Sequence, residues 1–412
     1  MGIGKYQIKV FDYTGVIRFE LFDFKSLYIS EDLNDVGSWK ITSHSLEKCP
    51  FNQDDGIVVY RNGIQIFCGI LSKIDEEYDF ATKSWAWTAS GTGFNVMLKW
   101  RFIRPDPTQF EMRYRYRSFQ NSAIGAIIFS LISDVRYTTI YGIPILGSCM
   151  NFSRSPKDNN ENTIKYRYEN LFEIVTGLAN NFGYTIVPLY RESSSVYTEL
   201  SQKITVFVTP QRDLSDTVVY RDFTDGILSF RHISIAPEND TVLMSYNSPE
   251  DVYWQDIWKY DTSLVYPSDT WRAYNHRYNF VKPNKDDFEE QFLYSKLDTL
   301  CSKEAEKYYI ASEGYEIEID TRKDLYSYGF RWDEEGAMPI LQDYNIGDTI
   351  GIEFQGEKYK GQVTRMEYSV SYGEEKIIPT VGIISKGTFR GILSNVSDLN
   401  NKVNKASNEE AA

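Results

Sequence analysis

The sequence is poor in the residues that build most metal and nucleophile sites. Among its 412 residues there are only four cysteines and three histidines. The cysteines form no Cys-x-x-Cys pair, so each is typical of a small buried apolar residue that stays reduced. The histidines have no partner at metal-ligand spacing, so neither zinc binding nor catalysis by a histidine base is indicated. These residues are Cys49, Cys68, Cys149, Cys301, His44, His232 and His276.

The motifs of the common enzyme classes are missing as well. The chain has no Gly-x-Ser-x-Gly, no Ser-x-x-Lys and no phosphate-binding GxxxxGK[ST], and Gly91-Thr92-Gly93 lacks the third glycine of a dinucleotide-binding loop. Asp and Glu are plentiful, which leaves a pair of glycosidase carboxylates open, but none stands out from a solvated background. We therefore predict no catalytic residues, no cofactor and no metal.

Long apolar runs are absent too, which predicts that no segment spans a membrane. The N-terminus shows no charged region followed by an apolar one, so no signal peptide is expected. With 42% hydrophobic and 25% charged residues, the composition is that of a soluble globular protein made in the cytoplasm, with two to four domains. The net charge of −14 disfavours tight nucleic-acid binding, although nucleic acid could cross such a surface without sticking.

What the chain does contain is a strong β signal. Aromatic residues make up 15%, and they pack well on pleated sheets. Residues 17–21, 39–42 and 84–91 alternate as half-buried strands do. We predict a first antiparallel β-module over residues 1–105, which ends at Arg104-Pro105-Asp106-Pro107 because proline interrupts regular structure.

The middle of the chain changes to a mixed pattern. Apolar residues recur at helical spacing over 121–133 and 169–181, and Gly183 is placed to end the second helix. Strands are expected at 184–187 and 203–208. These elements predict an α/β insertion domain over residues 106–220.

The β signal returns in a second module, predicted for residues 221–389. Strands are expected at 228–235, 241–246 and 315–319, a helix at 286–311 and a long loop at 249–283. The last segment, 390–412, carries apolar residues at heptad spacing, which indicates either a short coiled coil or a polar tail. The residues of this heptad seam are Ile392, Val396, Leu399 and Val403.

One pattern occurs twice. GIVVYRNGIQIFCGILSKI, residues 56–74, and DTIGIEFQGEKYKGQVTRM, residues 348–366, each combine a β-rich run, a polar residue with glycine, a second run and another glycine. Asn-Gly between β-rich runs predicts a hairpin turn. Five residues separate the glycines in the first copy and four in the second, which indicates a bulge or a longer loop in the first. Either the chain holds two similar β-modules, or two unrelated hairpins share turn chemistry. The residues concerned are Asn62, Gly63, Gly69, Gln355, Gly356 and Gly361.

Two further features allow more than one interpretation. In Arg113-Tyr114-Arg115-Tyr116-Arg117 the arginines alternate, and we favour an ion-paired surface or subunit contact over phosphate binding because the chain is acidic. The Trp- and Tyr-rich tract at 249–283 could stack on sugars, but aromatic packing or a protein interface is favoured.

Taken in order, several motifs resemble the hub proteins of siphophage tail tips, also called baseplate-hub or tail-associated lysin N-terminal proteins. The similarity spans about residues 10–385. The motifs are Asp35-Val36-Gly37-Ser38-Trp39-Lys40-Ile41, the stretch 55–63, Phe67-Cys68-Gly69-Ile70, Trp87-Thr88-Ala89-Ser90-Gly91, Arg104-Pro105-Asp106-Pro107, the stretch 344–350 and Pro379-Thr380-Val381-Gly382.

This resemblance implies a mainly β, overall α+β fold with two tube-like antiparallel β-barrel modules and an α/β insertion. It implies a homotrimer in a virion, whose six modules match a sixfold tail-tube or distal tail ring above and whose threefold end anchors a fibre or receptor-binding protein below. DNA would pass through during ejection without specific binding. Since the chain ends at Ala412, we expect no lytic domain. The alternatives are a carbohydrate- or receptor-binding β-module of a virion and, less favoured, a cell-wall hydrolase.

Overall fold

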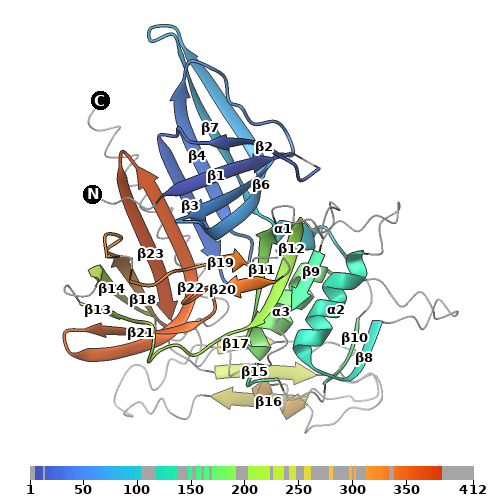
Figure 1. Cartoon of the computed structure of the whole chain (residues 1–412). Coiled ribbons are helices and arrows are strands. Elements are labelled where there is room, and N and C mark those ends of the chain that lie inside the picture. The colour runs from blue at the N-terminus through green and yellow to red at the C-terminus, as the bar shows by residue number, and fades with distance from the viewer. Residues whose placement is uncertain are drawn as a thin grey trace, which may run out of the picture. The chain divides into compact units, whose positions relative to one another are not determined.

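Figure 1 shows the computed structural model of the chain, which divides into two compact units. One unit holds residues 1–231 and 315–381, and the other holds 232–314 and 382–412. The structure describes residues 5–12, 14–103, 117–136, 147–150, 155–158, 162–166, 169–191, 203–222, 226–235, 241–246, 255–260, 278–281, 297–298, 301–302, 312–323, 325–333 and 338–382.

The first module is an antiparallel sheet of seven strands in the order β3-β4-β7-β6-β5-β1-β2. The expected alternation is present, since Trp39 and Ile41 in β4 are buried while Lys40 between them is exposed. The strands are β1 (Tyr6–Phe11), β2 (Ile17–Leu21), β3 (Ser26–Asp32), β4 (Ser38–Ser45), β5 (Gly56–Arg61), β6 (Ile64–Asp79) and β7 (Ser84–Gly93).

The second module has the strand order β14-β18-β23-β22, with β21 beside β22 and β13 beside β21. A short hairpin of β19 and β20 pairs with β6 through Phe330 and Gln65. The strands are β13 (Val219–Arg221), β14 (Ile227–Ile235), β18 (Ser312–Ile319), β19 (Phe330–Trp332), β20 (Pro339–Leu341), β21 (Thr349–Phe354), β22 (Glu357–Ser371) and β23 (Glu374–Gly382).

The two modules are parts of one 15-stranded sheet, because β22 pairs with β3 (Figure 1). Their buried side chains also form a single core cluster, in which Leu27 and Ile29 of β3 join Met366 and Tyr368 of β22. The mainly β prediction is confirmed. The described strands form an open path rather than a closed sheet, so the expected barrels are not seen in this part of the chain.

The insertion packs two helices against small sheets with the orders β11-β12-β9 and β10-β8. The predicted helix at 121–133 begins later, at Ile124, because 117–122 is a strand that ends beside Asn121 at a positive φ of 49°. The elements are α1 (Val96–Lys99), β8 (Arg117–Ser122), α2 (Ile124–Arg136), β9 (Gly147–Met150), β10 (Asn162–Tyr166), α3 (Leu171–Phe182), β11 (Tyr184–Tyr190) and β12 (Ile204–Pro210).

The second predicted helix of the insertion is confirmed as α3. The Asn170 side chain accepts hydrogen bonds from the backbone N–H groups of Phe172 and Glu173, which caps the N-terminus. Gly183 ends the helix at a left-handed φ of 71°, a conformation that glycine adopts without strain. The strand β11 follows immediately, as the sequence predicts.

The other unit contains a three-stranded sheet with the order β16-β15-β17. Its strands are β15 (Thr241–Tyr246), β16 (Gln255–Tyr260) and β17 (Tyr278–Val281). The long loop expected over 249–283 is therefore wrong for β16 and β17. Both strands are short and mix polar with aromatic residues, so the sequence shows no period that would predict them. Each is a strand because it pairs with β15.

Several expectations fall outside the described residues. Of the helix predicted at 286–311, the structure describes helical residues only at 297–298 and 301–302. The C-terminal segment from residue 383 onward lies outside them entirely. Among the helices that are described, none is long and apolar enough to cross a membrane.

Candidate functional site

The two predicted hairpins have the same turn. Asn62 and Gly63 connect β5 to β6 with φ angles of 52° and 77°. Gln355 and Gly356 connect β21 to β22 with φ angles of 54° and 82°. Positive φ at both central residues is the requirement of a type I′ turn, whose twist matches that of the flanking strands.

The one-residue difference between the hairpins is a bulge. In the first hairpin Val59 pairs with Phe67 and Tyr60 pairs with Gln65, which leaves Ile66 without an opposite residue. The second hairpin stays in register along its whole length. The bulge that the sequence indicates as one of two explanations is therefore present in the first copy.

The next glycines occupy matching positions. Gly69 pairs with Ile57, and Gly361 pairs with Ile350. Both isoleucines are fully buried. At Gly69 an added Cβ would lie 2.4 Å from the backbone oxygen of Thr92, so the close approach of β7 requires a residue without a side chain.

A second bulge follows at the same distance from each of these glycines. The pairing of β6 with β7 shifts between Leu71 and Lys73, at Ser72. The pairing of β22 with β23 shifts between Val363 and Arg365, at Thr364. Since Ser72 and Thr364 each lie three residues after the glycine, turn, glycine and bulge recur in one arrangement. Lys73 thus corresponds to Arg365.

The surrounding strands repeat the same order. In the first module it is β3-β4-β7-β6-β5, and in the second it is β14-β18-β23-β22-β21. Each hairpin therefore occupies the same place in its half of the sheet. Two hairpins that shared only turn chemistry would not need matching neighbours.

The module interface is the antiparallel pairing of residues 365–371 in β22 with residues 26–32 in β3. Arg365 Nε donates to Asp32 Oδ1 at 2.8 Å, and its Nη1 donates to Glu367 Oε1 at 3.3 Å. Because backbone pairing and ion pairs coincide here, the register between the two modules is fixed.

A second contact between the modules is a buried ion pair. Arg61 Nε of β5 lies 2.8 Å from Glu375 Oε1 of β23, and their side chains are 10% and 1% exposed. The Tyr6 hydroxyl donates to the same carboxylate at 2.6 Å. Burial and the Glu375 charge raise the pKa of Tyr6 well above its usual range, so this hydroxyl keeps its proton. Removing either charge would break the ion pair and leave the other charge buried.

The interface also holds a carboxyl group that titrates near neutrality. Glu31 in β3 is opposite Met366 and accepts a hydrogen bond from the Tyr328 hydroxyl. Burial raises the pKa of Glu31 to about 7, against the lowering effect of that hydrogen bond. The charge state of the interface therefore changes with pH in the neutral range.

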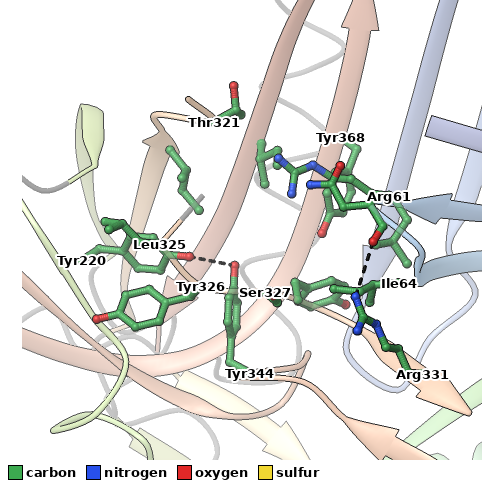
Figure 2. Close-up of a pocket in the computed structure, with 15 residues that line it drawn as sticks. Arg61, Ile64, Tyr220, Thr321, Leu325, Tyr326, Ser327, Arg331, Tyr344 and Tyr368 are labelled. Atoms are coloured by element: carbon green, nitrogen blue, oxygen red, sulfur yellow. Dashed lines mark hydrogen bonds between the residues drawn. The ribbon is translucent and has the colours of Figure 1, made fainter. Parts of the chain in front are cut away.

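Side chains from both modules line a cavity of about 180 Å³ (Figure 2). The Tyr220 hydroxyl donates to that of Tyr344 at 3.2 Å, and Arg331 donates to the backbone oxygen of Asn62 at 3.5 Å. Burial raises the pKa of Tyr344 to about 12, so it remains neutral. The cavity contains paired polar groups and aromatic rings, which is the composition of a packing void more than of a reaction centre.

The insertion is fixed to both modules by hydrogen bonds. Asn34, after β3, donates to the Tyr184 oxygen at 2.9 Å and accepts from the Ile186 N–H at 2.8 Å, as a neighbouring strand would do for β11. Arg212, after β12, lies 2.5 Å from Asp348 at the start of the second hairpin. The insertion thus holds the two modules from one side.

The predicted site residues divide into two groups. Asn62, Gly63 and Gly69 lie in one hairpin, and Gln355, Gly356 and Gly361 lie in the other. Three stretches lie outside the described residues: the heptad positions Ile392, Val396, Leu399 and Val403, the arginines at 113 and 115, and most of the aromatic tract.

The two histidines that the structure describes lie on different strands. His44 is an exposed residue of β4, and His232 is an exposed residue of β14. Within the described ranges no group of three His, Cys, Asp or Glu side chains could hold a metal ion.

Sequence reasoning missed Glu31 and the Arg61–Glu375 pair. The two charged residues of that pair are 314 positions apart. Arg61 lies in the first copy of the repeated hairpin, but Glu31 and Glu375 lie in β3 and β23, outside both copies. No signal within a single sequence brings these residues together.

Comparison with known proteins gives one family and several similar structures. The family model described as "Siphovirus ReqiPepy6 Gp37-like protein" matches residues 7–383. No curated protein matches the chain.

Among solved structures, the chain is similar to the 43 kDa tail protein of prophage MuSo2 from Shewanella oneidensis, with 13% identity, a TM-score of 0.54, and coverage of 91% of this chain and 97% of that one. For the tail protein of Neisseria meningitidis MC58 the identity is 12%, the TM-score 0.53 and the coverage 92% and 96%. For prophage tail protein gp18 of Listeria monocytogenes EGD-e the values are 11%, 0.50, and 95% and 98%. At these identities the similarity shows a shared fold.

Proposed function

The chain belongs to the family of Siphovirus ReqiPepy6 Gp37-like proteins, and on this premise we propose that it is a structural hub protein of a phage tail tip or baseplate. The three similar structures named above share its fold over nearly their whole length, and each is described as a tail protein. In the part of the chain that the structure describes, buried polar groups such as Arg61 and Glu375 link one strand to another. This use of buried charge supports a structural role in the virion rather than catalysis.

The observation that carries this proposal is the repeated half-sheet. One chain contains the strand order of β3-β4-β7-β6-β5 twice, with the same turn, glycine and bulge. Three copies of the chain then present six similar modules. Such a homotrimer adapts a sixfold tail-tube ring on one face to threefold fibre or receptor-binding proteins on the other.

The acidic character of the chain is compatible with a channel for DNA. Cations lining such a channel would hold the phosphate backbone through counterion release, and this chain has a net charge of −14. We propose that DNA passes during ejection without specific binding. A strongly basic channel wall at the level of this protein would contradict that part of the proposal.

The heptad positions Ile392, Val396, Leu399 and Val403 complete the proposal as a trimer seam that also anchors the fibre. Deletion of residues 391–412 tests this element by itself. We expect the truncated chain to form a weaker trimer or to lose its distal partner, and an unchanged trimer that still recruits the partner would contradict the role.

The mass of the native oligomer tests the hub. We expect the full-length protein, measured by sedimentation equilibrium over a concentration series and again with the tail-tube protein present, to be a trimer. A chain that stays monomeric under both conditions, or that forms stable dimers, would contradict the proposal.

A further inference from the structure

The second half of β6 has an open edge. Residues 73–79 pair with β7, and among the described residues no other strand pairs with them. The side chains here are mostly exposed, and Lys73 and Asp75, which form an ion pair at 2.7 Å, are each 67% exposed. Unpaired backbone N–H and C=O groups on such an edge are a template for another strand.

The corresponding segment of β22 is covered on that edge. Residues 365–371 pair with β23 on one side and with β3 on the other, where they form seven residue pairs. The bulges at Ser72 and Thr364 place Lys73 at the position of Arg365, so the open segment of β6 corresponds to the strand half that forms the module interface.

The strand that corresponds to β3 is β14, and it lies at the end of the sheet. In the described part of the chain it pairs only with β18, as β3 would if β22 were absent. Within the described residues, the chain thus has one half of the module interface at each end of the sheet. At one end β6, which corresponds to β22, pairs with no counterpart of β3. At the other end β14, which corresponds to β3, pairs with no counterpart of β22.

Charge supports a contact between these two edges. The open segment of β6 carries Asp75, Glu76, Glu77 and Asp79 beside the single cation Lys73, and all five side chains are exposed. On β14 the exposed charged side chain is that of Arg231, whose Nη1 lies 2.9 Å from Glu316 Oε2 of the neighbouring strand β18. In the module interface Arg365 also contacts a carboxylate of its own module, Glu367, together with Asp32 across the interface. Arg231, paired with Glu316, would face the acidic strand in the same way.

We propose that residues 73–79 of β6 in one chain pair antiparallel with β14 of a second copy of this chain, and so repeat the module interface between copies. The inference rests on the proposed function, because it states how the chains of the ring join. The contact is heterologous: every copy offers both edges, so a ring that closes leaves neither edge open. The other reading, in which the acidic side chains keep this edge unpaired, is an outcome of the test.

Cross-linking tests this contact in the full-length chain. The variant Glu77→Cys/Ser229→Cys places one thiol on each edge, and a short bismaleimide joins them if they lie close together. We expect covalent dimers and trimers on a denaturing gel and none from either single variant. The pair Tyr28→Cys/Ser369→Cys, whose residues are opposite each other in the module interface, should link within one chain. The pair Asp216→Cys/Ser229→Cys, with an exposed residue away from β6, is the negative control.

The outcomes separate the two proposals. Trimers by sedimentation that give links between chains support both. Trimers by sedimentation in which Glu77→Cys/Ser229→Cys links no more than the negative control overturn this inference and leave the hub intact. A chain that remains monomeric, alone and with the tail-tube protein, overturns the hub and the contact together.

Discussion

The strands β6 and β22 begin alike and end differently. Each follows a type I′ turn, passes a buried glycine and bulges three residues later. Beyond the bulge, Tyr368 of β22 is buried against β3, whereas Glu76 at the same position of β6 is exposed and accepts a hydrogen bond from the Cys49 N–H at 2.9 Å. The turn and bulge chemistry is common to both modules, while the side chains beyond the bulge differ according to whether the strand finds its neighbour within the chain.

The largest expected difference is between truncations at these two positions. Tyr368→Ala removes a ring that is 1% exposed from the shared core, and we expect it to lower the free energy of unfolding by about 3–5 kcal/mol. Glu76→Ala at the matching site removes only one exposed hydrogen bond, from the Cys49 N–H, and should lower the free energy of unfolding by about 0.5–1 kcal/mol. Urea midpoints of the two variants compare them directly. Equal losses would show that the two strand halves are not in different environments.

The pH dependence of stability, through Glu31, tests the module interface, which β22 forms with β3. Its pKa in the folded state is raised to about 7, so this group stabilises the fold when protonated, and that contribution is lost as pH rises from the unfolded value near 4.5 through 7. We expect Glu31→Gln to remove a pH-dependent loss on the order of 3 kcal/mol over this window. The measurement is the urea midpoint of both proteins between pH 5 and 8. A stability difference between wild type and variant that does not change with pH would contradict the raised pKa of Glu31.

Charge reversal tests the open edge of β6, where we expect an effect on assembly and none on folding. Asp75→Lys/Glu77→Lys should leave the fold intact, since both side chains are exposed, but should raise the dissociation constant of the oligomer by about tenfold. The matched control is Asp216→Lys/Glu374→Lys, which changes the same charge at two exposed positions outside β6. Sedimentation equilibrium of the two double variants decides the question. An equal effect in both would assign the loss to net charge alone.

The smallest expected effect on stability comes from the turn glycines, a feature that the two hairpins share. An added Cβ at Gly63 or Gly356 meets no atom within 4 Å, so each Gly→Ala change costs only the strain of a positive φ. We expect each to destabilise the protein by about 1 kcal/mol. Thermal unfolding of the two variants gives the comparison. A cost at one position that is several times that at the other would show that the two turns are not equivalent.

The sequence predicted local features well and distant ones poorly. Gly183 ends α3 as expected, and Asn62 with Gly63 forms the expected turn, because these signals depend on φ angles and capping groups within a few residues. The sequence pattern places the start of α2 too early, since residues up to Ser122 belong to the strand β8, which has its partner in β10.

For the same reason, the sequence predicts the hairpins of the candidate site but not the interface between the modules. The repeated hairpins could be recognised from glycine spacing alone, but the pairing of β22 with β3 joins residues more than 330 positions apart, as in the hydrogen bond from Arg365 to Asp32. The strands β16 and β17 were missed because their order depends on β15 and not on a period of their own. Long-range pairing is decided by the whole sheet, which no local pattern encodes.

The central claim is that one chain carries two equivalent modules, so that three chains build a ring of six. Cryo-electron microscopy of the assembled tail tip tests it most directly. We expect three copies around the axis, with six similar half-sheets at one radius and β6 of each copy beside β14 of the next. A different number of copies, or first and second modules at different radii from the channel, would contradict it.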